Sequence, residues 1–393
     1  MSPMSPTSSS PPRPRVVIFT TYFHPVIGGV ESNARRLATF LERQGFPIVV
    51  LTKRIDGTLP DREDVDGVEV RRIGPRGERS GAGKWKLIPA ATNWLVRHRD
   101  QYEVVCCVDY RGIGMAAIAA RVITGRRVVV QGQTPGVLGP GFLKGVAAMV
   151  YKRADAFACI GHELEREAVA AGVPADRVHY LPNAVDMQRF RPADLVERSL
   201  IRRGLGIEPD QLVVVFVGRL SREKGAMELL EAWQRLQPVD ATLIVAGPDM
   251  TDHPWDVGPA ARAYAEEHKL TNVRFTGPTT DPVPFYQMAD VAVQPSHFEA
   301  LGLSAVEALA CGVPVVASAV GGLLDFIVDG KNGRLCPPQD ADALAECLRP
   351  LLADARYRIG LASHARASVQ DVFDERVVFG RFGDLLTRLA EQS

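Results

Sequence analysis

The chain has 393 residues, and its 46 Lys and Arg are balanced by 46 Asp and Glu, so its formal net charge is zero. At about 150 residues per domain, this length predicts two or three domains. Hydrophobic residues make up 46% and charged residues 23% of the sequence, which excludes a wholly disordered or fibrous chain. Zero net charge argues against a general nucleic-acid binder, because such a protein needs a basic surface.

The charge is unevenly distributed along the chain. Residues 1–190 carry 26 basic and 18 acidic side chains, and residues 191–393 carry 20 and 28. The first part therefore has a net charge of +8 and the second a net charge of −8. This asymmetry indicates that the two halves meet different partners.

The six cysteines include no C-x-x-C pair, so the usual metal-ligand spacing is absent. Cys106, Cys107 and Cys159 lie in apolar runs, where a free thiol packs as a small hydrophobic group. These features predict a reduced, cytoplasmic protein. Residues 1–14 are rich in Ser and Pro without an apolar core, which predicts a disordered tail and no signal peptide.

The first half alternates short apolar runs with helical stretches. Uninterrupted runs rich in Val and Ile are typical of parallel strands that are buried on both faces. In Val30–Leu41 the apolar side chains fall on one face and the charged ones off it, which predicts a helix. The predicted strands are Val16–Thr20, Ile48–Thr52, Val68–Ile73, Val104–Val108, Val128–Gln131, Phe157–Ile160 and Val178–Leu181.

The alternation stops at Leu181–Pro192, which has a proline near each end and no clear period, so residues 183–192 are predicted to be a linker. Beyond it, residues 226–236 and 354–390 have helical patterns. The strands predicted in this half are Leu212–Val217, Thr242–Ala246, Val273–Thr276, Val291–Gln294 and Val315–Ala317.

Strand–helix alternation of this kind predicts an α/β fold built from doubly wound parallel sheets. We expect two Rossmann-like domains, over residues 15–182 and 193–370. A final helical segment, 371–393, is expected to pack back on the first domain. Ligands of such sheets bind beyond the carboxyl ends of the strands, so the site is expected in a cleft between the two facing domains.

Several familiar motifs fail on inspection. Gly139–Gly145 misses G-x-G-x-x-G by one position, and Gly77–Lys84 is followed by Trp85 where a P-loop needs Ser or Thr. Asp64-Val65-Asp66 has the D-x-D spacing that some sugar-transfer enzymes use for a divalent ion, but it lies in a polar turn that precedes a strand. We therefore expect no bound metal and no cofactor.

Three segments each follow a predicted strand and open a helix, which is where a ligand would bind. The first contains Gly28 and Gly29, whose backbone can approach a ligand closely beside the free N–H groups of a helix start. A plain tight turn explains this segment equally well. The second contains Arg219 and Lys224 before the helix over 226–236. Cations normally favour helix C-termini, so two at the opposite end suggest an anion such as a diphosphate, with a solvated turn as the alternative.

The third segment, over residues 298–308, carries two glutamates. Glu299 lies in the loop after the strand Val291–Gln294, and Glu307 lies inside an otherwise apolar helix. An unpaired buried carboxylate is costly, so Glu307 is expected to meet a cation or hydroxyl groups such as those of a ribose. The backbone N–H groups of Gly302 and Leu303 could hold a phosphate at the helix start. A surface helix with one isolated glutamate is the alternative.

These segments resemble the signature set of retaining glycosyltransferases of family 4, which have the GT-B fold. The resemblance rests on "GGVE", "GRLSREKG", "PNAVDMQRFRP" and "HFEALGLSAVEALACGVPVVAS", and it covers about Val16 to Ala353. The E-x7-E spacing of Glu299 and Glu307, with Arg219 and Lys224 upstream, is a specific combination of that family.

The resemblance implies a role for each residue. Arg219 and Lys224 would neutralise the leaving diphosphate of a nucleotide-sugar, and Glu299 would hold sugar hydroxyls and stabilise the transition state. Glu307 would bind the ribose, and Gly29 would place its backbone against the phosphate. The rest of the implied donor site is Gly28, Leu301, Gly302 and Leu303. The family's front-face mechanism needs no separate protein base, and two cations can replace a divalent ion.

The sequence departs from the family pattern on the acceptor side. Many members carry a His near the transferred sugar where this chain has Gln133, which can hydrogen-bond a hydroxyl but cannot act as an acid or base. His is also common where Cys106 and Val108 stand. We expect Gln133, Asp109 and Trp85 on the acceptor side, and these departures leave the sugar and the acceptor undecided.

The densest basic stretch of the first half, Arg71–Lys86, contains Trp85 and lies near Trp94. Cations beside aromatic side chains are typical of a membrane interface, so this stretch is expected to meet an anionic acceptor or the inner membrane surface. A solvated loop and helix face is the alternative.

The sequence therefore predicts a cytoplasmic glycosyltransferase that contacts the membrane at most peripherally. It is expected to move a sugar from a nucleotide-diphosphate sugar, a UDP-sugar or GDP-mannose, to a hydroxyl of a glycan, lipid or small molecule. A sugar-nucleotide epimerase of the same build and a non-catalytic sugar-nucleotide-binding module are the alternatives.

Overall fold

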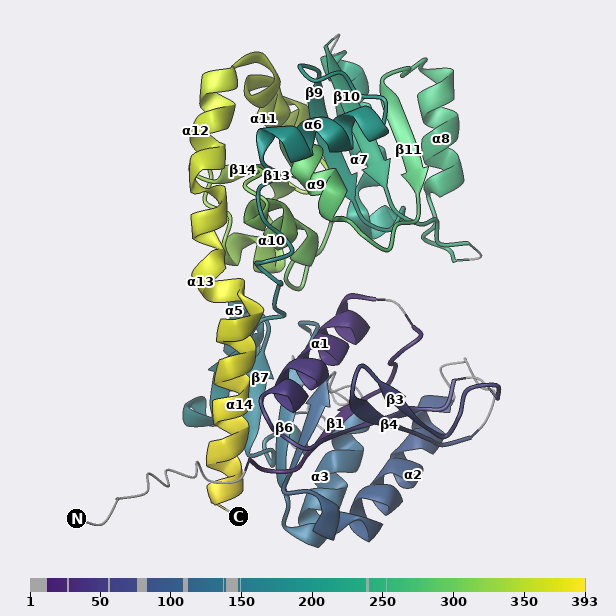
Figure 1. Cartoon of the computed structure of the whole chain (residues 1–393), viewed down its shortest axis with the longest axis vertical. Helices are drawn as coiled ribbons and strands as arrows, with labels where there is room; N and C mark the ends of the chain where they lie inside the picture. Colours follow the sequence, from purple (N-terminus) through teal and green to yellow (C-terminus); the bar gives the residue numbers. More distant parts are fainter. Residues whose placement is uncertain are drawn as a thin grey trace, which may run out of the picture. The chain divides into compact units, whose positions relative to one another are not determined.

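The computed structural model describes residues 13–26, 28–55, 57–75, 83–108, 112–136, 138, 148, 150–237, 240–251 and 253–392. The chain forms two compact units (Figure 1). Unit 1 consists of Met1–Cys159, Leu164–Leu181 and Phe379–Ser393, and unit 2 consists of Ile160–Glu163 and Pro182–Val378.

The sheet of unit 1 has the strand order β3-β4-β2-β1-β5-β6-β7-β8. All neighbours pair in parallel except β3 and β4. Every strand predicted from the sequence in this half is present, with its ends shifted by one residue at most. The bounds are β1 Val16–Thr20, β2 Ile48–Lys53, β3 Arg62–Val65, β4 Val68–Ile73, β5 Val104–Val108, β6 Arg127–Gly132, β7 Ala156–Cys159 and β8 Val178–Tyr180.

The edge strand β3 was not predicted, because three of its four residues are charged and three point at least partly to solvent. It forms a hairpin with β4, and the prediction that Asp64 lies in a turn was wrong. Asp64 belongs to β3 and accepts a hydrogen bond from the N–H of Gly67 at 2.9 Å. Asp66 does lie in the turn, with φ 56°, and forms an ion pair with Arg35 at 2.6 Å.

Helices cover both faces of this sheet, as Figure 1 shows for α1 on one side and α2 and α3 on the other. In α1 the side chains of Ala34, Leu37, Ala38 and Leu41 are buried, which confirms the predicted apolar face. Helix α14 packs on α1 through the rings of Phe40 and Phe379, whose centroids lie 5.6 Å apart. Within the described residues, the helices of unit 1 are α1 Gly29–Arg43, α2 Gly83–Arg97, η1 Arg99–Gln101, α3 Ile113–Thr124, α5 His162–Ala170, η2 Ala175–Arg177 and α14 Glu375–Glu391, of which α5 and α14 begin in unit 2.

The sheet of unit 2 has the order β11-β10-β9-β12-β13-β14, with all neighbours parallel. Taken in sequence, this is the 3-2-1-4-5-6 order of a Rossmann fold. The last strand was not predicted, because Arg334 interrupts its four residues. The bounds are β9 Leu212–Val217, β10 Ala241–Ala246, β11 Val273–Gly277, β12 Val291–Gln294, β13 Val315–Ser318 and β14 Gly333–Cys336.

The core of unit 2 fills the space between this sheet and helices α7, α8 and α11, around the fully buried side chain of Trp233. Three helices begin at an aspartate whose carboxylate accepts backbone N–H bonds: Asp194, Asp340 and Asp354. The helices are α6 Leu195–Gly204, η3 Arg222–Lys224, α7 Ala226–Leu236, α8 Gly258–Glu267, α9 Val283–Met288, α10 Leu303–Ala310, η4 Gly321–Asp325, α11 Ala341–Ala353, α12 Ala355–Ala365, η5 Arg366–Ser368 and α13 Gln370–Phe373.

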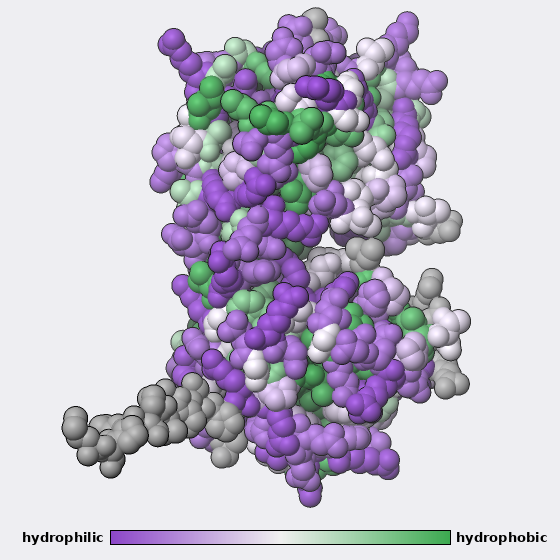
Figure 2. Space-filling model, viewed as in Figure 1, coloured by the Kyte–Doolittle hydropathy of each residue, from purple (hydrophilic) through white to green (hydrophobic). Residues whose placement is uncertain are grey.

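Both units are therefore α/β domains with Rossmann-like parallel sheets, as predicted. Figure 2 shows that hydrophilic residues cover most of the face in view, in keeping with the apolar strands being interior. Within the described ranges, no helix combines the length and apolar character needed to cross a bilayer.

Candidate active site

The site is built where the strand order of the unit 2 sheet reverses. Strands β9 and β12 are neighbours: the chain continues from β9 to β10 and β11 on one side of β9, and from β12 to β13 and β14 on the other side. Ligands of open α/β sheets bind beyond the carboxyl ends of the strands at such a point. Here these ends lead into Gly218–Gly225 after β9 and Pro295–Gly302 after β12, which are the two segments singled out in the sequence.

The loop after β9 carries Arg219 and Lys224. The Arg219 side chain is about half exposed and forms an ion pair with Glu223 at 2.8 Å. Lys224 ends the short helix η3, immediately before α7, and its side chain is 20% exposed. Both cations therefore lie where the sequence predicts them, with Arg219 facing solvent and Lys224 turned inward.

A close backbone approach holds this loop against the loop after β12. Gly225 has φ +70° and begins α7, and a Cβ at this position would lie 1.9 Å from the carbonyl oxygen of Pro295. Only glycine satisfies both the left-handed conformation and this contact. The N–H of His297 also donates to the carbonyl oxygen of Glu223 at 2.8 Å. The two loops therefore form one surface.

The centre of that surface is the carboxylate of Glu299, which is 8% exposed. Its Oε1 atom accepts hydrogen bonds from Nζ of Lys224 at 2.6 Å, Nε2 of Gln294 at 2.7 Å and Oγ of Ser296 at 2.9 Å. Charge-assisted bonds of this kind hold a carboxylate in one orientation. Lys224 and Glu299, 75 residues apart in sequence, are thus brought into direct contact.

Two glycines fix the backbone that follows Glu299. A Cβ on Gly321 would lie 1.9 Å from the carbonyl oxygen of Glu299, and one on Gly322 would lie 2.5 Å from that of Ala300. The N–H of Gly322 donates to the Glu299 carbonyl at 3.1 Å. The loop is therefore positioned by the η4 turn as well as by its own side chains.

Glu307 lies on α10, where it is half-buried. Its Oε2 atom accepts a hydrogen bond from the hydroxyl of Tyr286 at 3.2 Å. Burial, and next the charge of Glu307, raise the pKa of the Tyr286 phenol well above its usual value, so Tyr286 is a permanent donor. The hydroxyl of Tyr286 therefore supplies one of the hydroxyl contacts expected for Glu307.

The start of α10 has the geometry expected of an anion-binding turn. Gly302 is its N-cap, with φ 88° and no side chain to cap the helix, and a Cβ there would lie 2.4 Å from Leu323. Leu301 is buried, and Leu303 is half-buried at the first helical position. The N–H groups of a helix's first turn lack intrahelical partners and favour negative charge.

In unit 1 the corresponding strand end leads to Gly28 and Gly29. Gly28 is the N-cap of α1 in an extended conformation, and Gly29 has no atom within 4 Å of where its Cβ would lie. A Cβ on Gly28 would meet the flexible carboxylate of Glu31 at 2.2 Å. The backbone at Gly29 is therefore open to an approaching group.

Comparisons with known proteins agree with this geometry. Residues 27–189 match the model of Glycosyltransferase Family 4, and residues 197–367 match that of Glycosyl transferases group 1. The chain is 31% identical to the D-inositol 3-phosphate glycosyltransferase of Xylanimonas cellulosilytica, over 90% of this chain and 92% of that protein.

The chain is a family 4 glycosyltransferase.

Solved structures show that this glycosyltransferase has the GT-B fold. Sucrose-phosphate synthase from Thermosynechococcus elongatus matches 96% of this chain and 100% of its own, with a TM-score of 0.79 and 24% identity. HepE from Anabaena, in complex with UDP and glucose, matches 95% and 99%, with a TM-score of 0.77 and 21% identity. The predicted family and fold are confirmed.

The residues predicted for the acceptor side of the glycosyltransferase are less informative. Gln133 follows β6 and is buried, with 4% exposed. Asp109 and the side chain of Trp85 lie outside the described residues.

The predicted basic face over Arg71–Lys86 needs a correction. The Arg72 side chain is 1% exposed, forms an ion pair with Glu63 and donates to the carbonyl oxygen of His24 at 2.8 Å. Arg72 therefore joins strand β3 and the segment at His24 inside unit 1, and it does not face a partner. Arg71 is ion-paired with Glu69, and Lys86 is exposed, whereas the rest of the stretch's basic side chains lie outside the described residues.

Sequence reasoning missed the residues that position the site. Gln294 and Ser296 bind Glu299, Glu223 pairs with Arg219, and Tyr286 reaches Glu307 from α9. Gln294 had one signal, because it is the polar last residue of an apolar strand. Tyr286 had none, since only the packing of α9 on α10 brings it near Glu307.

Proposed function

We propose that this glycosyltransferase is a retaining enzyme that uses a nucleotide-diphosphate sugar and transfers the sugar to a hydroxyl acceptor. The observation that carries the proposal is the contact between Lys224 and Glu299, beside Arg219, at the switch point of the unit 2 sheet. At that point the cation can bind an anionic group of a substrate, while the carboxylate accepts hydrogen bonds from its hydroxyls.

Lys224 and Arg219 would stabilise the leaving diphosphate. An ammonium group has three N–H donors and a guanidinium has five, and the described contacts occupy one on each residue, with Glu299 and Glu223. The remaining donors can bind phosphate oxygens as negative charge develops on them. Positive charge placed in advance at the leaving group lowers the barrier without reorganisation during the reaction.

The two glutamates would orient the sugar and the nucleoside. Glu299 is fixed through one carboxylate oxygen, which sets the direction in which it meets sugar hydroxyls and the developing positive charge at the anomeric carbon. Glu307, with its orientation fixed by Tyr286, would accept hydrogen bonds from the ribose hydroxyls. The open backbone at Gly29 would approach the diphosphate, and the start of α10 at Gly302 and Leu303 would hold one of its phosphates.

In the proposed step, the bond from the anomeric carbon to the diphosphate oxygen breaks, and the acceptor oxygen forms a new bond to that carbon on the same face. The acceptor's proton passes to the departing phosphate oxygen. No separate protein base is needed, and the charge of Lys224 and Arg219 takes the place that a divalent ion has in other sugar transferases. Transfer in the presence of EDTA is the expected result.

The donor is proposed to be a UDP-sugar or GDP-mannose, and the acceptor a glycan, lipid or small molecule with a free hydroxyl. The complex of HepE with UDP and glucose favours a UDP-sugar, and the inositol-phosphate relative favours a small polar acceptor. We place the reaction in the cytoplasm. Contact with an anionic inner membrane through Arg71 and Lys86 is tested by flotation with anionic and neutral liposomes, and equal recovery from both would contradict it.

The test is nucleotide release from a panel of UDP-sugars, GDP-mannose and ADP-glucose, offered with inositol phosphate, simple glycosides and cell extract. Glu299→Gln keeps the size of the side chain but removes its charge, and we expect release to fall about 100-fold or more. The matched control is Glu346→Gln, because Glu346 is exposed on α11 and pairs with Arg349 on the same helix. The anomeric configuration of the product, read by proton NMR, decides between retention and inversion.

The alternatives give different results in the same assay. An epimerase would convert the donor sugar without an acceptor. A non-catalytic module would bind nucleotide tightly and turn over no donor. Either outcome contradicts the proposed transfer, as does an inverted product for the retaining mechanism.

A further inference from the structure

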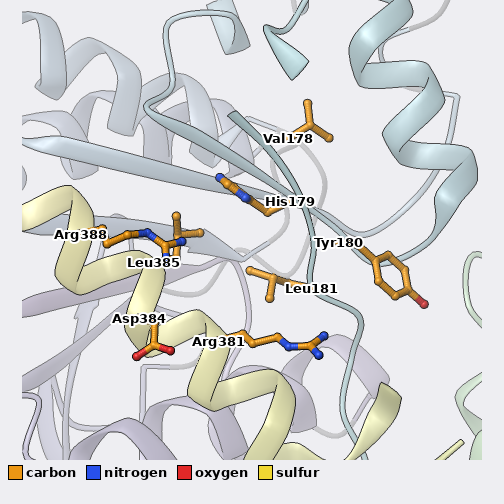
Figure 3. A pocket seen from close by; sticks show the side chains of 8 residues that line it. All are labelled: Val178, His179, Tyr180, Leu181, Arg381, Asp384, Leu385 and Arg388. Atoms are coloured by element: carbon orange, nitrogen blue, oxygen red, sulfur yellow. The ribbon is translucent and has the colours of Figure 1, made fainter. Parts of the chain in front are cut away.

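A second concave surface lies in unit 1, between the edge strand β8 and helix α14 (Figure 3). It has a volume of about 310 Å³, which is enough for a small ligand. The strand contributes residues 178–180, and Leu181 follows it. The helix contributes Arg381, Asp384, Leu385 and Arg388.

The two arginines give this groove its chemistry. They are seven residues apart, so two helical turns place them on one side of α14, about 10 Å apart along its axis. Figure 3 shows both side chains extending from α14 in the same direction, with Arg388 beside Leu385 and Arg381 below Leu181 in this view. Both are exposed, and within the described part of the chain neither forms an ion pair or a hydrogen bond.

The charges around the groove are not balanced by its own carboxylate. Asp384 lies between the arginines in sequence, but its oxygens are more than 4.0 Å from both guanidinium groups. Opposite them, His179 is half-buried on β8. Its pKa is lowered by burial and next by the charge of Arg388, and Asp176 opposes these effects only in part. The groove thus carries excess positive potential next to a neutral imidazole.

We propose that the groove between β8 and α14 binds a phosphate dianion, free or as part of a small phosphate ester, through Arg381 and Arg388. Guanidinium groups match phosphate oxygens in bidentate geometry, and the two guanidinium charges outnumber the single carboxylate charge of Asp384. His179 would add a third hydrogen bond, donated as N–H from β8. The site consists of unit 1 residues alone and shares no residue with the proposed donor site.

The groove also adjoins two of the four places where the chain passes from one unit to the other. Leu181 is the last residue before the chain enters unit 2 at Pro182, and Arg381 lies two residues after it returns at Phe379. A ligand that joins β8 to α14 would therefore restrain the backbone beside both passages. Slower amide hydrogen exchange in residues 178–181 and 379–388 is the expected signature of binding.

The test uses inorganic phosphate and glucose 6-phosphate with the full chain, and reads affinity by calorimetry and amide protection by hydrogen-exchange mass spectrometry. The double variant Arg381→Gln/Arg388→Gln is expected to weaken binding about tenfold or more and to abolish protection at both segments. Arg376→Gln is the matched control, because Arg376 lies on the same helix but is paired with Asp374. It should bind as the wild type does.

A third variant separates this groove from the donor site. Lys224→Ala, which weakens the proposed donor site, should leave the protection at 178–181 and 379–388 unchanged. Protection that survives Arg381→Gln/Arg388→Gln, or that disappears in Lys224→Ala alone, would overturn the proposal. Failure of sugar transfer with the groove protection intact would instead count against the proposed function and leave this site standing.

Discussion

The two units share one design at the amino ends of their strands and differ at the carboxyl ends. In unit 1, Asp155 immediately precedes β7, and its carboxylate accepts bonds from Arg121, Arg127 and the N–H of Val128 at the start of β6. In unit 2 the same arrangement recurs. Asp290 immediately precedes β12 and accepts bonds from Arg198, Arg202 and the N–H of Val213.

At the carboxyl ends the likeness stops. In unit 2, Lys224, Gln294 and Ser296 all donate to one carboxylate oxygen of Glu299. In unit 1, the same edge of the sheet presents the open glycine backbone at Gly29. A shared topology therefore fixes where a ligand can bind, and the loops decide what chemistry occurs there. The amino-end clusters tie neighbouring strands together and should serve stability alone.

The largest effect is expected from Lys224→Ala. The loss of one preorganised cation at the leaving group should lower kcat about 100- to 1000-fold. Stability should fall as well, because the buried carboxylate of Glu299 loses its cation. Donor-release kinetics measure the effect, and Lys331→Ala, at an exposed lysine in the same unit, is the control. A rise in KM alone, with kcat unchanged, would contradict the assigned role.

Asp155→Asn tests the opposite end of the sheet. Two arginines would lose their buried partner, so we expect a loss of about 3 kcal/mol in the free energy of unfolding, with the kcat of the remaining folded protein unchanged. Denaturant titration and kinetics on the same sample measure both. A large loss of kcat in the folded protein would contradict the idea that the amino-end cluster serves stability alone.

The same residue predicts a pH dependence. Although burial opposes it, the bonds from Arg121, Val128 and Arg127 lower the pKa of the Asp155 carboxyl below its usual value. The stabilisation is therefore complete above the pKa of the unfolded chain, about 3.9, and is lost as the pH falls through the lower folded value. The stability gap between wild type and Asp155→Asn should be constant from pH 7 to pH 5 and close below about pH 4.

Gly225→Ala tests the contact that joins the two loops of the unit 2 site. The added methyl meets the Pro295 carbonyl and occupies a left-handed conformation, so we expect a loss of about 2–3 kcal/mol in stability together with reduced turnover. Gly45→Ala on unit 1 is the control, since it has φ +83° but no neighbouring atom. Equal losses in the two variants would show that the backbone conformation, and not the contact, is decisive.

The smallest effect on stability is expected from Gly29→Ala. No atom lies near the new methyl group, so the free energy of unfolding should change by less than about 1 kcal/mol. If the diphosphate approaches this backbone, KM for the donor should rise several-fold. An unchanged KM would remove Gly29 from the site and leave unit 2 as its sole contributor to donor binding.

The sequence by itself determined every strand except β3 and β14, together with the Rossmann-like fold class and the residues that carry the proposed chemistry. Apolar runs such as Val104–Val108 are buried on both faces in any parallel sheet, and a cation at a helix start is unusual wherever it occurs. Arg219, Lys224 and Glu299 were therefore recognisable from their local context and from the resemblance that their spacing carries.

Only the tertiary structure decided which of these residues touch and what holds them. Lys224 reaches Glu299 across 75 residues of sequence, Tyr286 reaches Glu307 from another helix, and Arg72 turns inward to Glu63 although it stands in a basic stretch. The charge and periodicity of a segment tell how that segment folds, but not which distant residues its side chains will contact. Contacts between distant segments depend on how the sheets are ordered and how closely glycines such as Gly225 and Gly321 let their loops approach.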